Sequence, residues 1–193
     1  LAHLLNIHRG DKMNNLISMS SNQFGLTKYS QEKLSENNLW KNEDFKKGDM
    51  NITLIRTQNG KTIMLQHDVT SPRPYSRIFT VSGTEGFIQK YPIKSMSFSP
   101  NSHLSINLDA INDSLDRYEP KTIKNIKEQE NYRLIYCLRN GLPLDQDVYD
   151  AAEWSSIIEL SKKSVEKGSK PINIPDFTKG NWNKLEKVTY FLK

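Results

Sequence analysis

The stretch MNITLIRTQNGKTIMLQHD, residues 50–68, holds two runs of alternating β-branched and polar residues around Asn59-Gly60. Residues 50–57 and 61–68 each have the period-2 pattern of a half-buried strand. Asn-Gly between two such runs is the strongest short signal for a β-hairpin, because both positions of a type I′ turn need a positive φ. The stretch therefore predicts two adjacent antiparallel strands, and this hairpin decides the fold class.

Further strand patterns flank this hairpin, and helical patterns follow them. We expect strands at 14–22, within a second hairpin at 77–91 and at 93–99, helices at 107–120, 122–141 and 147–167, the end of a helix at 1–8, and only short helical turns at 23–48. Strands followed by helices predict an α+β fold, an open, mostly antiparallel sheet of about five or six strands with helices packed on one face. No G-x-G-x-x-G motif is present, so no dinucleotide-binding domain is expected in these residues.

The last of these helices has the clearest pattern. Asp147 is a good N-cap, and Gly168 followed by Pro171 stops the helix. An apolar face is expected from the residues that recur at helical spacing, which are Val148, Ala151, Ala152, Ser155 and Ile158. This helix is therefore expected to pack on the sheet.

Charge and apolar content exclude two classes of function. The net charge is +5, but the basic residues alternate with acidic ones along the predicted helices, so no nucleic-acid partner is expected. No apolar run approaches the roughly 20 residues that span a bilayer. The single Cys137 excludes an internal disulfide framework, and its place in a helical run predicts a core residue.

Residue types that bind metals or carry nucleophilic catalysis form no recognisable set. The histidines fit no metal-ligand spacing, so no metal site is expected; they are His3, His8, His67 and His103. There is no G-x-S-x-G motif. The carboxylates of Asp145, Asp147 and Asp150 are expected to cap a helix and to compensate its dipole. Arg9-Gly10-Asp11 is either a plain charged turn or a functional one.

The segment QHDVTSPRPYSR, residues 66–77, is the best candidate for a ligand contact. Pro72 and Pro74 fix their own φ and push the preceding residues into an extended conformation, so the segment is stiff before anything binds to it. Stiffening lowers the ordering entropy of binding. A tyrosine offers a ring face and a hydroxyl, and an arginine offers a planar fork of donors. The polar residues that gather there are His67, Asp68, Arg73, Tyr75 and Arg77.

Four long stretches, in this order, resemble glycoside hydrolase family 109. They are LLNIHRGDKMNNLISMSSNQFG (4–25), GDMNITLIRTQNGKTIMLQHDVTSPRPYSR (48–77), YRLIYCLRNGLPLDQDVYDAAEWSSIIELS (132–161) and IPDFTKGNW (174–182). The resemblance covers most of the chain and is weakest at 28–46 and 99–130. The family consists of NAD-dependent α-N-acetylgalactosaminidases within the Gfo/Idh/MocA oxidoreductase superfamily, and this chain resembles its C-terminal part.

The resemblance implies a two-domain parent protein. An N-terminal Rossmann domain, absent from this chain, would hold NAD, and residues 1–193 would be the substrate-side C-terminal α/β domain. The implied hydrolysis begins when NAD⁺ takes a hydride from C3 of the sugar. The resulting ketone acidifies the C2 proton, a base removes it and the glycosidic oxygen is eliminated. Water then adds, and the ketone is reduced again. The fragment alone is expected to be inactive.

The resemblance also assigns residues. Tyr75 matches a family tyrosine that contacts the sugar, and Arg73 and His67 are further substrate-binding candidates. The family's Tyr-Pro-Thr-His-Gly motif supplies a catalytic tyrosine and histidine; it is expected just upstream of Leu1, so this chain is expected to hold no catalytic residue. The family's Gly-His-Gly-Gly-Met-Asp segment is missing before NYRLIYCLRNG. The chain is then either a truncated or inactive relative or, the explanation that we favour, a sequence from which active-site loops are missing. The second explanation predicts a break in the chain near Glu130 and Asn131.

Two alternatives stay open beside the glycosidase. The parent could be an ordinary NAD(P)-dependent sugar dehydrogenase of the Gfo/Idh/MocA superfamily, or the domain could be a non-catalytic, sheet-mediated oligomerisation module. The resemblance implies a carbohydrate substrate, the chain's own Rossmann domain as a partner, and a homo-oligomer formed through the sheet face. It also implies a bacterial source. The compartment stays open, and the export signals of many relatives make the periplasm one of the alternatives.

Overall fold

A computed structural model describes the chain except for residues 1, 69, 92, 101–105, 108–125 and 187–193. The chain divides into two compact units, Leu1–Ser71 with Arg133–Lys193 and Pro72–Tyr132. The helix predicted at 107–120 falls almost entirely on residues outside the described part. Among the described residues, no helix is both long enough and apolar enough to cross a bilayer.

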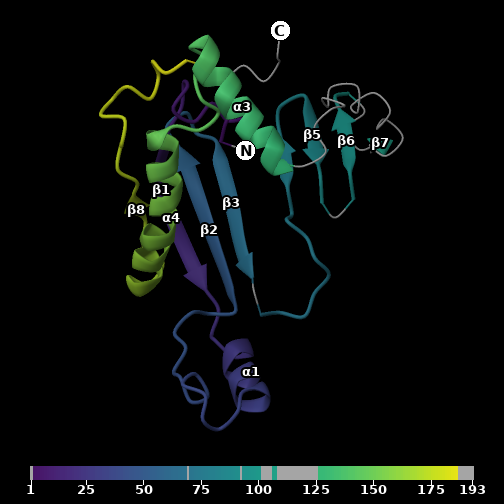
Figure 1. Cartoon of the computed structure of the whole chain (residues 1–193), viewed down its shortest axis with the longest axis vertical. Helices are drawn as coiled ribbons and strands as arrows, with labels where there is room; N and C mark the ends of the chain where they lie inside the picture. The colour runs from purple at the N-terminus through teal and green to yellow at the C-terminus, as the bar shows by residue number, and fades with distance from the viewer. Residues whose placement is uncertain (1, 69, 92, 101–105, 108–125, 187–193) are drawn as a thin grey trace. The chain divides into compact units, whose positions relative to one another are not determined.

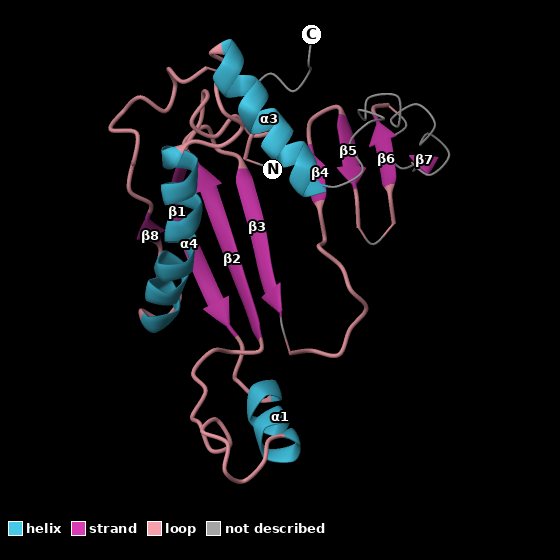
Figure 2. Cartoon of the chain, in the orientation of Figure 1, coloured by secondary structure: helices cyan, strands magenta, loops and turns pink. Residues whose placement is uncertain are grey.

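The first unit is built on a four-stranded antiparallel sheet (Figures 1 and 2). The strand order is β3-β2-β1-β8, with β1 at Met13–Ser20, β2 at Met50–Thr57, β3 at Thr62–Asp68 and β8 at Ile172–Asn173. The predicted strands at 14–22, 50–57 and 61–68 are confirmed. The short β8 was missed, since a two-residue strand leaves no periodic pattern in the sequence.

The hairpin between β2 and β3 is confirmed, but its turn differs from the predicted one. Only Gly60, with φ 85°, has a positive φ in the loop, whereas a type I′ turn would need one at Asn59 as well. The Thr57 N–H donates to the Lys61 carbonyl at 2.9 Å, which leaves a three-residue loop. Such loops need only one left-handed residue, and glycine supplies it without strain.

Helix α4, Val148–Glu166, covers one face of this sheet (Figure 1). Asp147 caps it as predicted, in a reciprocal capping box with Asp150. The core that joins the helix to the sheet contains Leu16, Ile55, Ile63, Ile157 and Leu160. Two hydroxyl contacts add to it: Ser164 accepts from the Ser18 N–H at 2.9 Å, and the Oγ atoms of Thr53 and Ser161 lie 3.2 Å apart.

The predicted inner face of α4 was wrong. Val148 and Ile158, both assigned to that face, are 71% and 79% exposed. The buried side chains of the helix are Asp150, Glu153, Ile157, Leu160, Ser161 and Ser164. The apolar pattern misled because half of this face is polar and finds hydrogen-bond or ion partners inside the unit.

The opposite face of the sheet exposes a group of large apolar side chains. Residues alternate between the two faces of a strand, so the neighbours of buried Leu16 and Ile55 point away from α4. The exposed ones on β1, β2 and β3 are Ile17 (40%), Met19 (67%), Ile52 (41%), Leu54 (47%) and Met64 (61%). We call these five residues the open sheet face.

Two segments of the first unit differ from expectation. Residues 2–10 form turns rather than the end of a helix, and Asn6 and His8 have positive φ values of 59° and 61° that no helix allows. Residues 25–33 form a full helix, α1 (Gly25–Lys33), where only short turns were expected. Asp49, although more than 20 residues away in the sequence, stabilises the start of α1, because its carboxylate accepts hydrogen bonds from the N–H groups of Phe24 and Gly25.

The second unit contains a separate antiparallel sheet of order β4-β5-β6-β7. Its strands are β4 (Thr80–Ser82), β5 (Gly86–Gln89), β6 (Ser95–Phe98) and β7 (Ile106–Asn107). The predicted hairpin at 77–91 and the strand at 93–99 are confirmed. The fold class is α+β with open antiparallel sheets, as predicted, but the strands form two sheets and not one sheet of five or six.

Helix α3, Ile126–Asn140, confirms the helix predicted at 122–141 and ends at Gly141, whose φ is 61°. The helix passes through Glu130 and Asn131 without interruption, so the expected chain break there was wrong. Residues on both sides of that point share one run of helical backbone. Cys137 is fully buried on α3, as its sequence context predicts.

Candidate functional site

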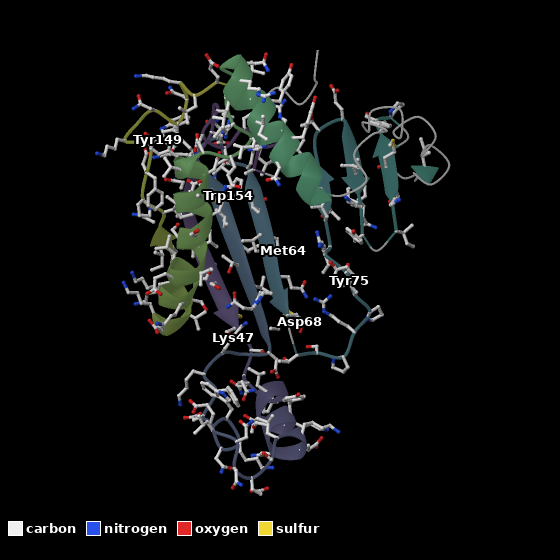
Figure 3. The ribbon with its side chains drawn as sticks, in the orientation of Figure 1. Lys47, Met64, Asp68, Tyr75, Tyr149 and Trp154 are labelled. Atoms are coloured by element: carbon white, nitrogen blue, oxygen red, sulfur yellow. The ribbon has the colours of Figure 1, made fainter. Side chains whose placement is uncertain are left out.

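The segment from Pro72 to Ile78 is coil that leads into β4 of the second unit. Tyr75 lies on this coil and is labelled in Figure 3; its side chain is 74% exposed. Ile78 has a φ of 42°, and its N–H donates to Ser76 Oγ at 3.1 Å. The segment is therefore an exposed loop, with Tyr75 offered to solvent.

Two neighbours fix the position of the Tyr75 ring. The Nε–H of Arg77 donates to the Tyr75 hydroxyl oxygen at 2.6 Å. The rings of Tyr75 and Tyr91 meet edge to face with their centroids 6.4 Å apart, a favourable aromatic geometry. The hydrogen bond that Arg77 donates to Tyr75 raises the pKa of Arg77, whose guanidinium is charged at any physiological pH. Tyr75 thus presents a ring face and an oriented hydroxyl, which together could bind a sugar.

The structure does not gather all three predicted site residues into one unit. Tyr75 and Arg73 lie in the second unit, both exposed. His67 is an exposed residue near the end of β3 in the first unit, paired with Asn51 of β2. Tyr75 is therefore the predicted residue with the best-defined surroundings, and those surroundings consist of Arg77 and Tyr91.

A second cluster, which the sequence did not predict, is buried in the first unit. His8 and Arg9 from the N-terminal turns meet Asp150 and Glu153 on α4, and none of the four side chains is more than 6% exposed. Arg9 donates to Asp150 through two parallel hydrogen bonds, Nη1 to Oδ1 at 3.1 Å and Nη2 to Oδ2 at 2.9 Å. His8 lies between the carboxylates, with Nδ1 3.4 Å from Asp150 Oδ1 and Nε2 3.3 Å from Glu153 Oε2. We call these four residues the buried ion network.

The members of this network stabilise one another in their charged forms. Burial by itself lowers the pKa of His8, but hydrogen bonds to Asp150 and Glu153 outweigh it and raise that pKa to about 9. Burial disfavours the ionised carboxylate of Asp150, yet hydrogen bonds from His8 and Arg9 hold its pKa far below the usual range. His8, Arg9 and Asp150 are therefore all charged at neutral pH.

Three side chains of this region also satisfy the distance requirement of a metal site. His8, Asp147 and Asp150 each offer an atom within 4.8 Å of the others. However, Arg9 already occupies both oxygens of Asp150, and a protonated imidazole has no lone pair for a metal. A histidine with a pKa near 9 is also a poor general base at neutral pH. The arrangement suits a structural role, holding the N-terminal turns against α4.

Stability should therefore fall on the alkaline side. A group whose pKa is raised on folding contributes stability below its unfolded pKa of 6.5 and loses it as the pH rises through about 9. We expect the thermal unfolding midpoint of the chain to drop between about pH 7 and about pH 10. In the His8→Gln variant this drop should be smaller, because the variant has no imidazolium to lose. An equal drop in both proteins would contradict the assignment.

Asp11 joins the same N-terminal turns to the β2–β3 hairpin. Its carboxylate is fully buried; Oδ1 accepts from the N–H groups of Lys12 and Asn59 at 2.9 and 3.0 Å, and Oδ2 lies 3.1 Å from Lys61 Nζ. Although burial opposes ionisation, the hydrogen bond from Asn59 and its other partners lower the pKa of Asp11. The Arg-Gly-Asp segment is thus a structural turn with both charges satisfied.

A sequence signal for the buried network did exist. Ile157 and Leu160 are two buried apolar residues of α4, and stepping back from Ile157 by four and then three residues reaches Glu153 and Asp150. Two acids continuing an apolar stripe indicate buried charges that need cationic partners. The identity of those partners, 141 residues away for Arg9 and Asp150, is not contained in any local pattern.

The fold is similar to that of a sugar dehydrogenase. A solved structure of levoglucosan dehydrogenase, in complex with NADH and L-sorbose, superposes with a TM-score of 0.56 over 86% of this chain and 45% of that chain. The two sequences are 14% identical, so the likeness concerns the fold alone.

Bacterial relatives are much closer in sequence. A Bacteroides fragilis protein named alpha-N-acetylgalactosaminidase is 49% identical over 197 residues, and a Bacteroides thetaiotaomicron family 109 protein is 40% identical over 210. Both matches cover 95% of this chain but only 46% and 44% of the relative, so the chain spans less than half the length of these relatives. Both matched spans exceed the 193 residues of this chain, so each relative holds residues there that this chain lacks.

The family assignment rests on nearly the whole length of the chain. Residues 1–184 match the family described as "Glycosyl hydrolase 109, C-terminal domain". The match includes the open sheet, α4, the buried ion network and the Tyr75 loop. The chain belongs to glycosyl hydrolase family 109, as its C-terminal domain.

Proposed function

We propose that this chain is the substrate-side part of an NAD-dependent glycosidase that hydrolyses α-linked N-acetylgalactosamine. The observation that carries the proposal is the family match over residues 1–184, supported by 49% identity to a protein named alpha-N-acetylgalactosaminidase. In this proposal a Rossmann domain outside the present chain holds NAD. The catalytic tyrosine and histidine precede Leu1.

The proposed role of this domain is to bind the sugar. Tyr75 is exposed, its hydroxyl is oriented by Arg77, and its ring is supported by Tyr91. A ring face and a fixed hydroxyl suit a hexosamine, which has both apolar C–H faces and hydroxyl groups. Arg73 and His67 remain proposed substrate contacts without a defined partner on the sugar.

The proposed reaction needs no carboxylate pair in this domain. Oxidation at C3, elimination across C1 and C2, addition of water and final reduction return NAD to its starting form. The carboxylates of the buried ion network face His8 and Arg9 and lie below the surface, so they would not flank a glycosidic bond.

The test is hydrolysis of 4-nitrophenyl α-N-acetylgalactosaminide by the full-length protein supplied with NAD⁺. We expect release of 4-nitrophenol without net formation of NADH. A sugar dehydrogenase of the Gfo/Idh/MocA superfamily is the second candidate, which the sequence resemblance leaves open. It would instead form NADH in proportion to a free sugar and leave the aryl glycoside intact.

Oligomerisation is the third candidate role, and the open sheet face favours it. Apolar side chains grouped on a sheet face commonly mark an interface with another chain. We expect the Leu54→Glu variant of the full-length protein to sediment as a smaller species than the unmodified protein. Ile158→Glu is the matched control, because Ile158 is 79% exposed on α4 and lies off this face. A monomeric unmodified protein would refute this role.

Export to the periplasm belongs to the same proposal. It rests on the resemblance to relatives with export signals, and the relatives found here are bacterial. Fractionation of the source bacterium, with the protein detected by antibody, tests it: recovery in the cytoplasmic fraction would overturn this part.

A further inference from the structure

The start of the second unit is rich in positive charge. Residues 72–100 contain four basic side chains and one acidic side chain, Glu85, whereas the whole chain has 27 basic and 22 acidic residues. The four basic residues are Arg73, Arg77, Lys90 and Lys94. Such a local excess attracts anions over a distance of about one Debye length.

Two of these cations lie beside the two tyrosines described above. Arg77 donates to the Tyr75 hydroxyl at 2.6 Å, and Lys90 Nζ lies 6.0 Å from the centre of the Tyr91 ring. The two rings are themselves in edge-to-face contact. We call Tyr75, Arg77, Lys90 and Tyr91 the tyrosine cluster.

The two cations of the cluster keep donors available. Arg77 uses its Nε–H for Tyr75, which leaves the two Nη groups, and a guanidinium binds an anion through such a pair of parallel N–H groups. In the described part of the chain, no acidic side chain forms an ion pair with Arg77 or Lys90, and both residues are exposed. Holding the guanidinium through Tyr75 before binding lowers the cost of ordering it.

We propose that the tyrosine cluster binds an acidic group on the part of the substrate next to the α-linked sugar, with Arg77 and Lys90 as its cations. This inference rests on the proposed function and adds a substrate class to it. The acidic group is a carboxylate or a sulfur oxyanion, since both offer coplanar oxygens to a guanidinium. Tyr75 contacts the sugar, and Arg77, bonded to Tyr75, reaches the neighbouring group.

The experiment compares matched pairs of α-N-acetylgalactosaminides with the full-length protein. The carboxylate pair is the 4-carboxyphenyl and 4-carbamoylphenyl glycosides, and the sulfur pair is the 4-sulfophenyl and 4-sulfamoylphenyl glycosides. Each pair differs mainly in charge. We expect kcat/KM to favour the anionic member by about three- to tenfold in at least one pair, mainly through KM, and the preference to shrink in 0.3 M salt. The pair that shows it identifies the acidic group.

Variants then locate the effect. Arg77→Gln should abolish the preference for the anionic glycoside, and Lys90→Gln should reduce this preference by at least half. Arg77→Lys should retain part of the preference that Arg77→Gln loses. Lys28→Gln is the control, since it removes one positive charge on exposed α1 in the first unit. The readout is the ratio within a pair, so a general loss of activity cancels.

The outcomes distinguish a failure of the acidic-group proposal from a failure of the proposed glycosidase activity. Equal kcat/KM within both pairs, or a preference unchanged in Arg77→Gln, overturns the acidic-group proposal and leaves the glycosidase standing. Release of phenol from none of the four glycosides overturns the proposed function, and this inference falls with it.

Discussion

Replacing Asp150 with alanine should lower the free energy of unfolding of this chain by about 3–5 kcal/mol, the usual effect of breaking a buried ion pair from one side. The substitution removes both hydrogen bonds to Arg9 and one of the two carboxylate partners of His8, leaving the buried His8 and Arg9 with Glu153 as the remaining carboxylate of the network. It also removes half of the capping box that begins α4. For a chain of this size, the midpoint temperature of thermal unfolding should fall by roughly 10 °C.

An exposed ion pair on the same helix supplies the control. Lys162 and Glu166 are 3.9 Å apart at i,i+4 spacing, and both side chains are more than half exposed. Glu166→Ala should change the unfolding free energy by about 0.5 kcal/mol or less. If Asp150→Ala were as mild as Glu166→Ala, the network would not be holding the N-terminal turns to α4.

Replacing Tyr75 with phenylalanine in the full-length protein should reduce kcat/KM for 4-nitrophenyl α-N-acetylgalactosaminide by about 10- to 100-fold. The substitution keeps the ring and its contact with Tyr91 and removes only the hydroxyl that accepts from Arg77. A hydrogen-bonding hydroxyl lost from a binding site costs about 1.5–3 kcal/mol when a charged group is involved, which corresponds to that range.

Tyr29 offers a matched control for this experiment. It lies on α1 in the first unit and is 58% exposed, so Tyr29→Phe should leave kcat/KM within about twofold. Unfolding midpoints should be unchanged in both variants, because neither hydroxyl is buried. An unchanged kcat/KM in Tyr75→Phe would remove Tyr75 from the substrate site.

Much of the fold was predictable because it depends on local patterns. The hairpin around Asn59-Gly60 and the Asp147 cap follow from turn and capping chemistry within a few residues. The separation of β4–β7 from the first sheet was not predictable in this way. Both groups of strands have the same alternating pattern, and only tertiary packing decides which strands pair.

The sequence predicted the loop that carries Tyr75 but not the residues that Tyr75 contacts. The two prolines and Tyr75 marked the loop, but the sequence could not rank Arg77 above Arg73 as the partner of Tyr75. This hydrogen bond joins residues two apart on an irregular loop, whose backbone course no local pattern specifies. The buried ion network was missed for a different reason. The buried stripe of Ile157 and Leu160 continues to Glu153 and Asp150, but no local pattern identifies His8 and Arg9 as their partners.

The most direct test of the proposed glycosidase is to run the hydrolysis in ²H₂O and to analyse the released N-acetylgalactosamine. If the C2 proton is removed and replaced during turnover, the product should carry deuterium at C2, while no NADH accumulates. Direct displacement at C1 never breaks the C2–H bond. Product that retains hydrogen at C2 after full hydrolysis would therefore contradict the proposed mechanism and the role given to NAD.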